Sequence, residues 1–140
     1  MNVSTTHALI DWKAAHTVVS AAVKKAIDLG ININVSVADS GGNEAAFLRM
    51  PGAFLHSIEI AKDKAYTSAG FGFPTSQWEE IFKTEEMLKI GMPVRERLVV
   101  FGGGLPIMID DQLIGGVGVS GGSAEQDAEC AQAGIDAISK

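Results

Sequence analysis

Gly121, Gly122, Ser123 and Gln126 lie where an apolar stretch is followed by a helix-like segment, and they are the residues best placed to bind an anion. Glycines let a ligand approach the backbone closely, and a helix start offers unpaired N–H groups and a positive dipole end. Ser123 followed three residues later by Gln126 has capping-box spacing, which indicates a helix N-terminus. This corner, formed by Gly121, Gly122, Ser123 and Gln126, predicts a site for a carboxylate or another polar ligand but does not identify that ligand.

The same stretch contains Gly116-x-Gly118-x-x-Gly121, which formally matches a dinucleotide-binding fingerprint. The fingerprint requires a following strand with a ribose-binding acid, and too little chain remains for one. A structural glycine cluster is the favoured interpretation. A simple anion or polar ligand at the helix start remains open.

His16 is the second candidate for specific chemistry, because it borders the apolar side of a predicted helix near Val19 and Val23. The ordinary interpretation is a half-buried helix histidine. The alternative is an axial ligand to a porphyrin iron, which needs only one histidine in an apolar cleft. His7 and His56 are not paired with it in sequence, so no multi-histidine metal site is expected.

Asp39, Arg49 and Lys64 form a third candidate set, together with the corner at Ser123–Gln126. An arginine at a strand end can clamp a carboxylate through two parallel hydrogen bonds. A desolvated lysine or aspartate can act as a proton shuttle. Solvated surface positions are the ordinary alternative for Arg49 and Lys64, and a tight turn over 39–43 is the ordinary interpretation of Asp39. Cys130 is interpreted as a small buried thiol.

Composition excludes several classes of function. The 140 residues suffice for one domain over 1–140, with 46% hydrophobic and 20% charged residues. The net charge of −6 argues against nucleic acid or an anionic membrane as partner. No apolar run is long enough to span a bilayer. A single cysteine and the lack of a secretory signal predict a cytoplasmic protein.

The periodicity of apolar residues predicts an α+β domain with a central antiparallel sheet. Short turns between neighbouring strands require antiparallel pairing. The first helix is expected to be capped by Ser4, Thr5 or Thr6, and Ser76 with Glu79 has capping-box spacing. The expected helices are 8–29, 55–69, 76–82 and 124–138, and the expected strands are 32–38, 44–50, 98–101, 106–109 and 113–120.

A series of motifs resembles the GlcG/HbpS family of haem-binding-protein-like domains, which also occurs as the C-terminal domain of PduO-type proteins. The motifs are Val37–Gly42, Arg49–Ala53, Ile60–Ala65, Phe71–Ser76, Gly103–Ile107, and Ile114–Gly121 with Glu125–Asp127. The resemblance covers nearly the whole chain. It implies a profilin-like α/β/α sandwich, assembly into homo-oligomers (dimers or larger), and a haem or related tetrapyrrole ligand.

In some family members a histidine on the first helix is associated with haem ligation, and His16 is the candidate at that place. Glu59 and Asp63 do not clearly reproduce the metal-binding acidic helix of the secreted sensor-type members. The resemblance therefore favours a cytoplasmic ligand-binding protein with haem as cofactor and His16 as metal ligand.

Two alternatives stay open. One is a small catabolic enzyme acting on a carboxylated or aromatic metabolite by acid/base chemistry. The other is a structural oligomeric subunit, with Trp12, Phe71, Phe73 and Trp78 exposed at its interface.

Overall fold

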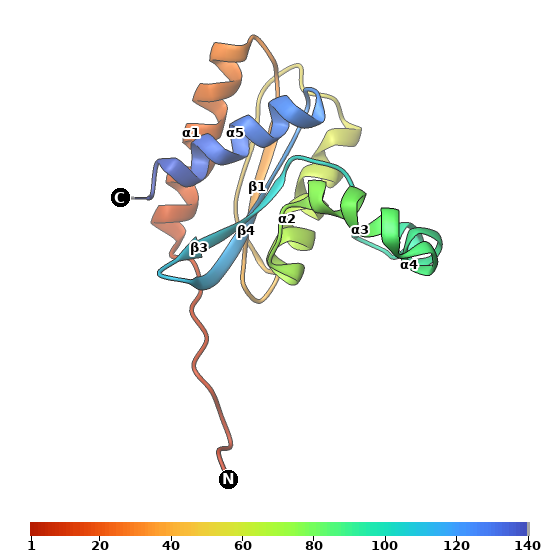
Figure 1. Ribbon diagram of the computed structural model, residues 1–140. Helices are drawn as coiled ribbons and strands as arrows, with labels where there is room; N and C mark the ends of the chain where they lie inside the picture. Colours follow the sequence, from red (N-terminus) through yellow and green to blue (C-terminus); the bar gives the residue numbers. More distant parts are fainter. Residues whose placement is uncertain (140) are drawn as a thin grey trace.

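The computed structural model describes residues 1–139, in which a four-stranded antiparallel sheet lies between two helical layers (Figure 1). The strands are β1 (Asn34–Asp39), β2 (Glu44–Arg49), β3 (Gly104–Ile109) and β4 (Gln112–Ser120), in the order β2-β1-β4-β3. Helices α1 (Trp12–Leu29) and α5 (Ala124–Asp136) cover one face, and α2 (His56–Phe71) covers the other. The predicted α+β architecture with an antiparallel sheet is confirmed.

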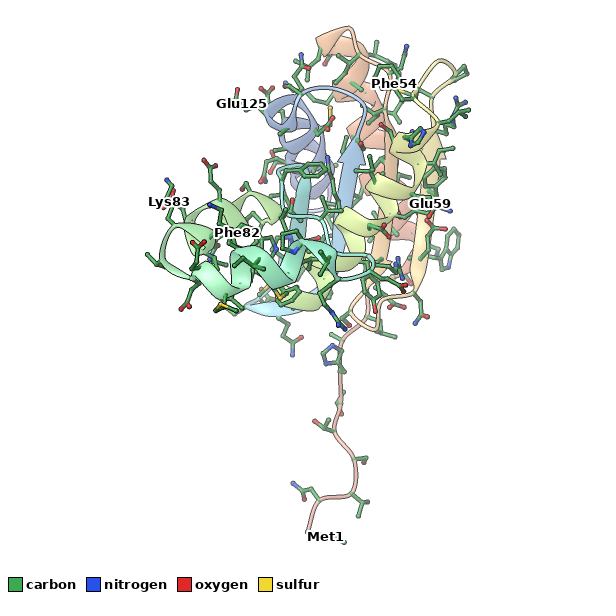
Figure 2. The ribbon with its side chains drawn as sticks, turned by 90° about the vertical axis from the view of Figure 1, so that its right-hand side faces the viewer. Met1, Phe54, Glu59, Phe82, Lys83 and Glu125 are labelled. Atoms are coloured by element: carbon green, nitrogen blue, oxygen red, sulfur yellow. The ribbon has the colours of Figure 1, made fainter. Side chains whose placement is uncertain are left out.

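The remaining helical segments project from one side of the sheet. They are a 3₁₀ turn (Thr75–Gln77), α3 (Trp78–Thr84), α4 (Glu86–Gly91) and a second 3₁₀ turn (Met92–Val94) (Figure 1). The N-terminal residues, with Met1 at their end, extend away from the folded body (Figure 2).

Successive side chains of β1 point alternately to the two helical layers that cover the sheet. Val35 and Val37 are fully buried and pack with Val117 and Val119 of β4 in the aliphatic core under α1 and α5. The intervening Ser36 and Ala38 point to the opposite face, as the two-residue period of a strand requires. Ala38 there packs with Ala65 and Ala69 of α2.

The glycines of β4 let α2 lie directly on the sheet. A methyl group on Gly118 would overlap the carbonyl oxygen of Ala61, and one on Gly116 would overlap that of Ala65. Only glycine permits such close approach of a helix backbone. The structural interpretation of the glycine cluster therefore fits the packing, and a nucleotide loop does not.

Three local predictions were wrong. The segment 98–101 is not a strand, because the backbone N–H of Val99 donates to Thr67 Oγ1 (3.1 Å) instead of to a neighbouring strand. Helix α1 begins at Trp12, where the Asp11 side chain accepts from Lys13 N (2.8 Å), and not after Ser4, Thr5 or Thr6. The 3₁₀ turn at 75–77 replaces the capping box expected at Ser76, and α3 has no side-chain cap.

No helix within residues 1–139 combines the length and apolarity needed to cross a membrane.

Candidate functional site

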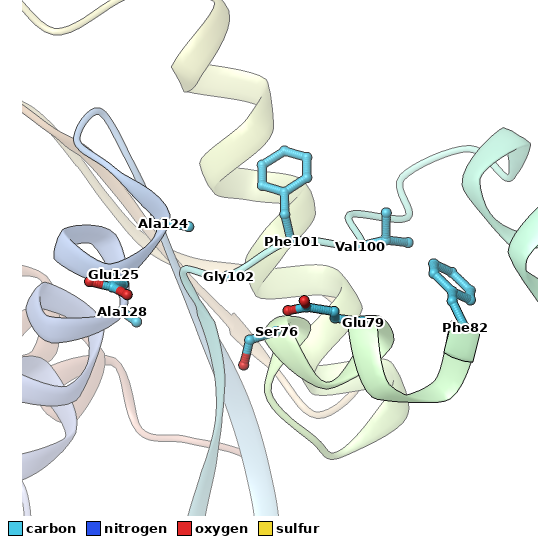
Figure 3. Close-up of a pocket in the computed structure, with 9 residues that line it drawn as sticks. All are labelled: Ser76, Glu79, Phe82, Val100, Phe101, Gly102, Ala124, Glu125 and Ala128. Atoms are coloured by element: carbon cyan, nitrogen blue, oxygen red, sulfur yellow. The ribbon is translucent and has the colours of Figure 1, made fainter. Parts of the chain in front are cut away.

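Of three cavities on the surface of residues 1–139, the largest, about 690 Å³, lies where the first turn of α5 faces α3 and the 100–102 loop (Figure 3). This volume is within the range of small-molecule sites. Its lining is Ser76, Glu79, Phe82, Val100, Phe101, Gly102, Ala124, Glu125 and Ala128. The wall is therefore mainly apolar and aromatic, with two carboxylates.

The predicted anion-binding corner borders this cavity but is closed by its own side chains. Ser123 Oγ accepts from Gln126 N (3.1 Å), and Gln126 Oε1 accepts from Ser123 N (3.0 Å), which confirms the capping box. Gly122 N donates to Asp127 Oδ1 (2.8 Å), and Gly121 packs against the backbone of Asn32. These amides are satisfied internally, so the residues that face the cavity are Ala124 and Glu125.

Lys64 lies behind one wall of the cavity. Its side chain is 1% exposed, and its ammonium donates to Val119 O (2.8 Å) and to Asp127 Oδ2 (3.1 Å). The ammonium is also 5.2 Å from the ring centre of Phe101, a half-exposed cavity residue. Burial lowers the pKa of Lys64, and the charge of Asp127 partly opposes that shift.

Asp39 and Arg49 do not join Lys64. Asp39 Oδ1 accepts from the backbone of Gly41 (2.9 Å) and Asn43 (3.0 Å), which fixes the β1–β2 turn. Arg49 Nη2 donates to Ala53 O (2.7 Å) and holds the loop after β2. Arg49 pairs with the first residue of β1 and Asp39 is its last, so about 17 Å of strand separates them. The three residues do not form one pocket.

His16 lies on the solvent-exposed side of α1 and lines none of the three principal cavities. The neighbouring Val18 contacts Gly134 near the end of α5, whereas Ser123 caps the start of that helix. The rise of a helix puts about 16 Å between those two ends of α5. His16 and the corner at Gly121–Gln126 therefore belong to separate surfaces.

The family model described as "Haem degrading protein HbpS-like" matches residues 10–136. The chain belongs to the HbpS-like family. An uncharacterized 15.0 kDa protein of Citrobacter freundii is 36% identical, over 100% of this chain and 99% of that protein. The corrinoid adenosyltransferase PduO of Salmonella typhimurium is 36% identical over 96% of this chain, which spans 40% of PduO.

Two crystal structures share the fold of this HbpS-like chain at comparable identity. The protein ORFY of Klebsiella pneumoniae superposes with a TM-score of 0.89 at 34% identity, covering 98% of this chain and 95% of ORFY. A structure described as a PduOC:heme complex superposes with a TM-score of 0.85 at 35% identity, covering 93% of this chain and 95% of that one.

Sequence reasoning missed the cavity side chains of this HbpS-like chain. Ser76, Glu79 and Phe82 recur every three residues along one helical side, and that spacing was a usable signal. Phe101 was overlooked as a cavity residue because residues 98–101 were predicted to form a strand. Trp78, expected at an exposed interface, is 3% exposed because it packs against Phe71, Phe73 and Phe82.

Within residues 1–139 of the HbpS-like chain, no three side chains of His, Cys, Asp or Glu converge as a metal site would require. Cys130 is a buried free thiol, and desolvation raises its pKa to about 11. A thiol of that kind is a poor nucleophile at neutral pH.

Proposed function

We propose that the chain binds haem or a closely related tetrapyrrole, with His16 as the axial ligand of the iron. The observation that carries the proposal is the match over nearly the whole chain to a structure described as a haem complex, at 35% identity. The family description and the position of His16 on the first helix support the same assignment.

His16 is exposed on α1 and lies in no apolar cleft, so the expectation of a half-buried histidine was wrong, and haem would have to bind on the surface of this helix. The groups around His16 fit such a surface ligand chemically. Its imidazole is exposed and makes no hydrogen bond to any residue within 1–139, which leaves a ring nitrogen free for iron. Trp12, 65% exposed, lies one helical turn away on the same side of α1 and offers an aromatic surface to a flat ring. Lys13, whose ammonium lies 5.6 Å from the Trp12 ring, can pair with a haem propionate.

The largest cavity is a poorer fit for haem iron. Its lining contains none of the usual axial ligands, which are histidine, cysteine, methionine and tyrosine. Glu79 and Glu125 would also repel the propionates. The α1 surface is therefore the site we propose.

Haem titration followed by absorbance tests this assignment. The wild type should develop a Soret band that saturates, and His16→Ala should weaken or abolish it. His56→Ala is the matched control, because His56 is also exposed on a helix but is the first residue of α2, on a different helix from His16. If the wild type develops no Soret band, the proposal of haem binding is wrong. If the two variants have equal effects, the assignment of His16 as the axial ligand is wrong.

A second candidate function is acid/base catalysis on a carboxylated or aromatic metabolite in the largest cavity. The specific observation in its favour is the ammonium of Lys64, whose pKa is lowered by burial and which lies behind Phe101. The aromatic alternative fits the cavity better than the carboxylated one, because Glu79 and Glu125 would repel a carboxylate. A thermal-shift titration with benzyl alcohol, a neutral aromatic probe, tests occupancy of the cavity. Stabilisation of the wild type but not of Phe82→Ala supports it, and no shift in either protein contradicts it.

We also propose that the protein is a homo-oligomer and resides in the cytoplasm. Exposed apolar side chains on and after α4, among them Met87, Ile90 and Val94, support association of copies. The single buried cysteine suits a reducing compartment.

A further inference from the structure

A separate cavity of about 320 Å³ lies beside the β1–β2 hairpin, on the face of the sheet that α2 covers. Its chemistry comes from five polar residues: Ser36, Asn43, Glu44, Lys62 and Arg97. The volume is at the lower end of the range for small-molecule sites and is sufficient for a small metabolite.

Two contacts orient Arg97 at the rim of this cavity. Its Nε donates to Asp63 Oδ1 (3.1 Å), and its guanidinium carbon lies 3.8 Å from the ring centre of Tyr66. The backbone of Arg97 has φ = 61°, a conformation that non-glycine residues rarely adopt. The two terminal guanidinium nitrogens of Arg97 make no hydrogen bond within residues 1–139. They are therefore oriented by the contacts of Nε and the ring and remain available to a ligand.

Lys62 and Glu44 contribute opposite charges to the same cavity without forming an ion pair. The ion pairs within residues 1–139 are Lys64–Asp127, Lys83–Glu80 and Arg97–Asp63. Glu44 is oriented by Ser36, a 1% exposed residue whose hydroxyl donates to Glu44 Oε1 (2.9 Å). The ammonium of Lys62 lies 5.1 Å from the ring centre of Phe47.

A ligand that satisfies both charges must carry an anion and a hydrogen-bond donor close together. Arg97 matches a carboxylate through two parallel hydrogen bonds, and Lys62 adds a second positive charge. Glu44, with one oxygen fixed by Ser36, is an acceptor for a hydroxyl or ammonium group. We propose that this cavity binds a small carboxylate with a hydroxyl or amino group on the adjacent carbon.

The site is distinct from the α1 surface proposed for haem, since none of its residues lies on α1. It is also distinct from the largest cavity, with which it shares no residue. Failure of haem binding therefore does not affect this proposal, and failure of this proposal does not affect haem binding.

Calorimetric titration with lactate, alanine and propionate tests the proposal, because these acids differ only in the group on the second carbon. Lactate or alanine should bind at least about tenfold more tightly than propionate, which corresponds to about 1.4 kcal/mol. Glu44→Gln should reduce that preference, whereas Lys62→Gln should weaken all three acids. Equal affinity for the three acids, or no binding of any, would overturn the proposal.

Arg97→Asn tests the carboxylate clamp, because asparagine tolerates positive φ and lacks the guanidinium. We expect the affinity for lactate or alanine to fall at least about tenfold. Arg95→Gln is the matched control, since Arg95 shares a neighbouring cavity with Arg97 but does not line the cavity beside the hairpin. An unchanged circular dichroism spectrum and an unchanged thermal unfolding midpoint show that Arg97→Asn remains folded, and unchanged affinity in that variant contradicts the clamp.

Discussion

Lys64 and Asp127 form a buried ion pair, with Nζ and Oδ2 3.1 Å apart, that joins α2 to α5. The two helices cover opposite faces of the sheet (Figure 1), so this ion pair connects the two helical layers near the end of β4. Val119 O and Gly122 N complete the hydrogen bonds of the pair. Each charge has the partner that a buried ionised group requires.

Removing one member of this pair should destabilise the protein strongly. We expect Lys64→Met to lower the free energy of unfolding by about 3–5 kcal/mol, because Asp127 would keep a buried charge without a partner. Urea denaturation measures the change. Lys83→Met is the control: it breaks an exposed pair with Glu80 and should change the free energy of unfolding by less than about 1 kcal/mol. Similar losses in both variants would contradict a special role for the buried pair.

Cys130 should make stability fall in alkaline solution. Burial disfavours the thiolate and raises the pKa of Cys130 from its ordinary value of 9.0 to about 11 in the folded protein. Between those values the unfolded state releases a proton that the native state keeps, so the contribution present below pH 9.0 is lost as pH rises toward 11. Denaturation of wild type and Cys130→Ala across this range measures it, and parallel pH profiles would contradict the assignment.

Gly118 should tolerate no side chain. In Gly118→Ala the added methyl group would meet the backbone of α2 at Ala61 and Ala65, neither of which can move aside alone. We expect a loss of more than about 4 kcal/mol in the free energy of unfolding, or failure to fold. Gly70→Ala in α2 is the control, because nothing lies within 4 Å of its added methyl group. That variant should gain about 0.5–1 kcal/mol from helix propensity.

Those glycines show what sequence could and could not predict. Period-two alternation, the Gly30 helix end and the Ser123–Gln126 capping box predicted most elements correctly, since these signals are local. The packing role of Gly118 depends on α2, which lies far away in the chain. The sequence therefore favoured a structural glycine cluster without identifying its contact, and left a polar ligand at the neighbouring helix start open. The same limit applies to Lys64, because its burial depends on Asp127, 63 residues later.

The segment around α4 should hold copies of the chain together. Helix α4 has six residues and none is buried, although so short a helix is not stable in water without packing. Met87, Ile90 and Val94 are 75%, 60% and 80% exposed, so an apolar surface is available for a second copy. We expect Ile90→Lys to lower the mass measured by light scattering without changing circular dichroism. Ile27→Lys, at an equally exposed site on α1, should leave the mass unchanged. A wild type that is already monomeric, or equal effects of the two substitutions, would show that α4 does not mediate association.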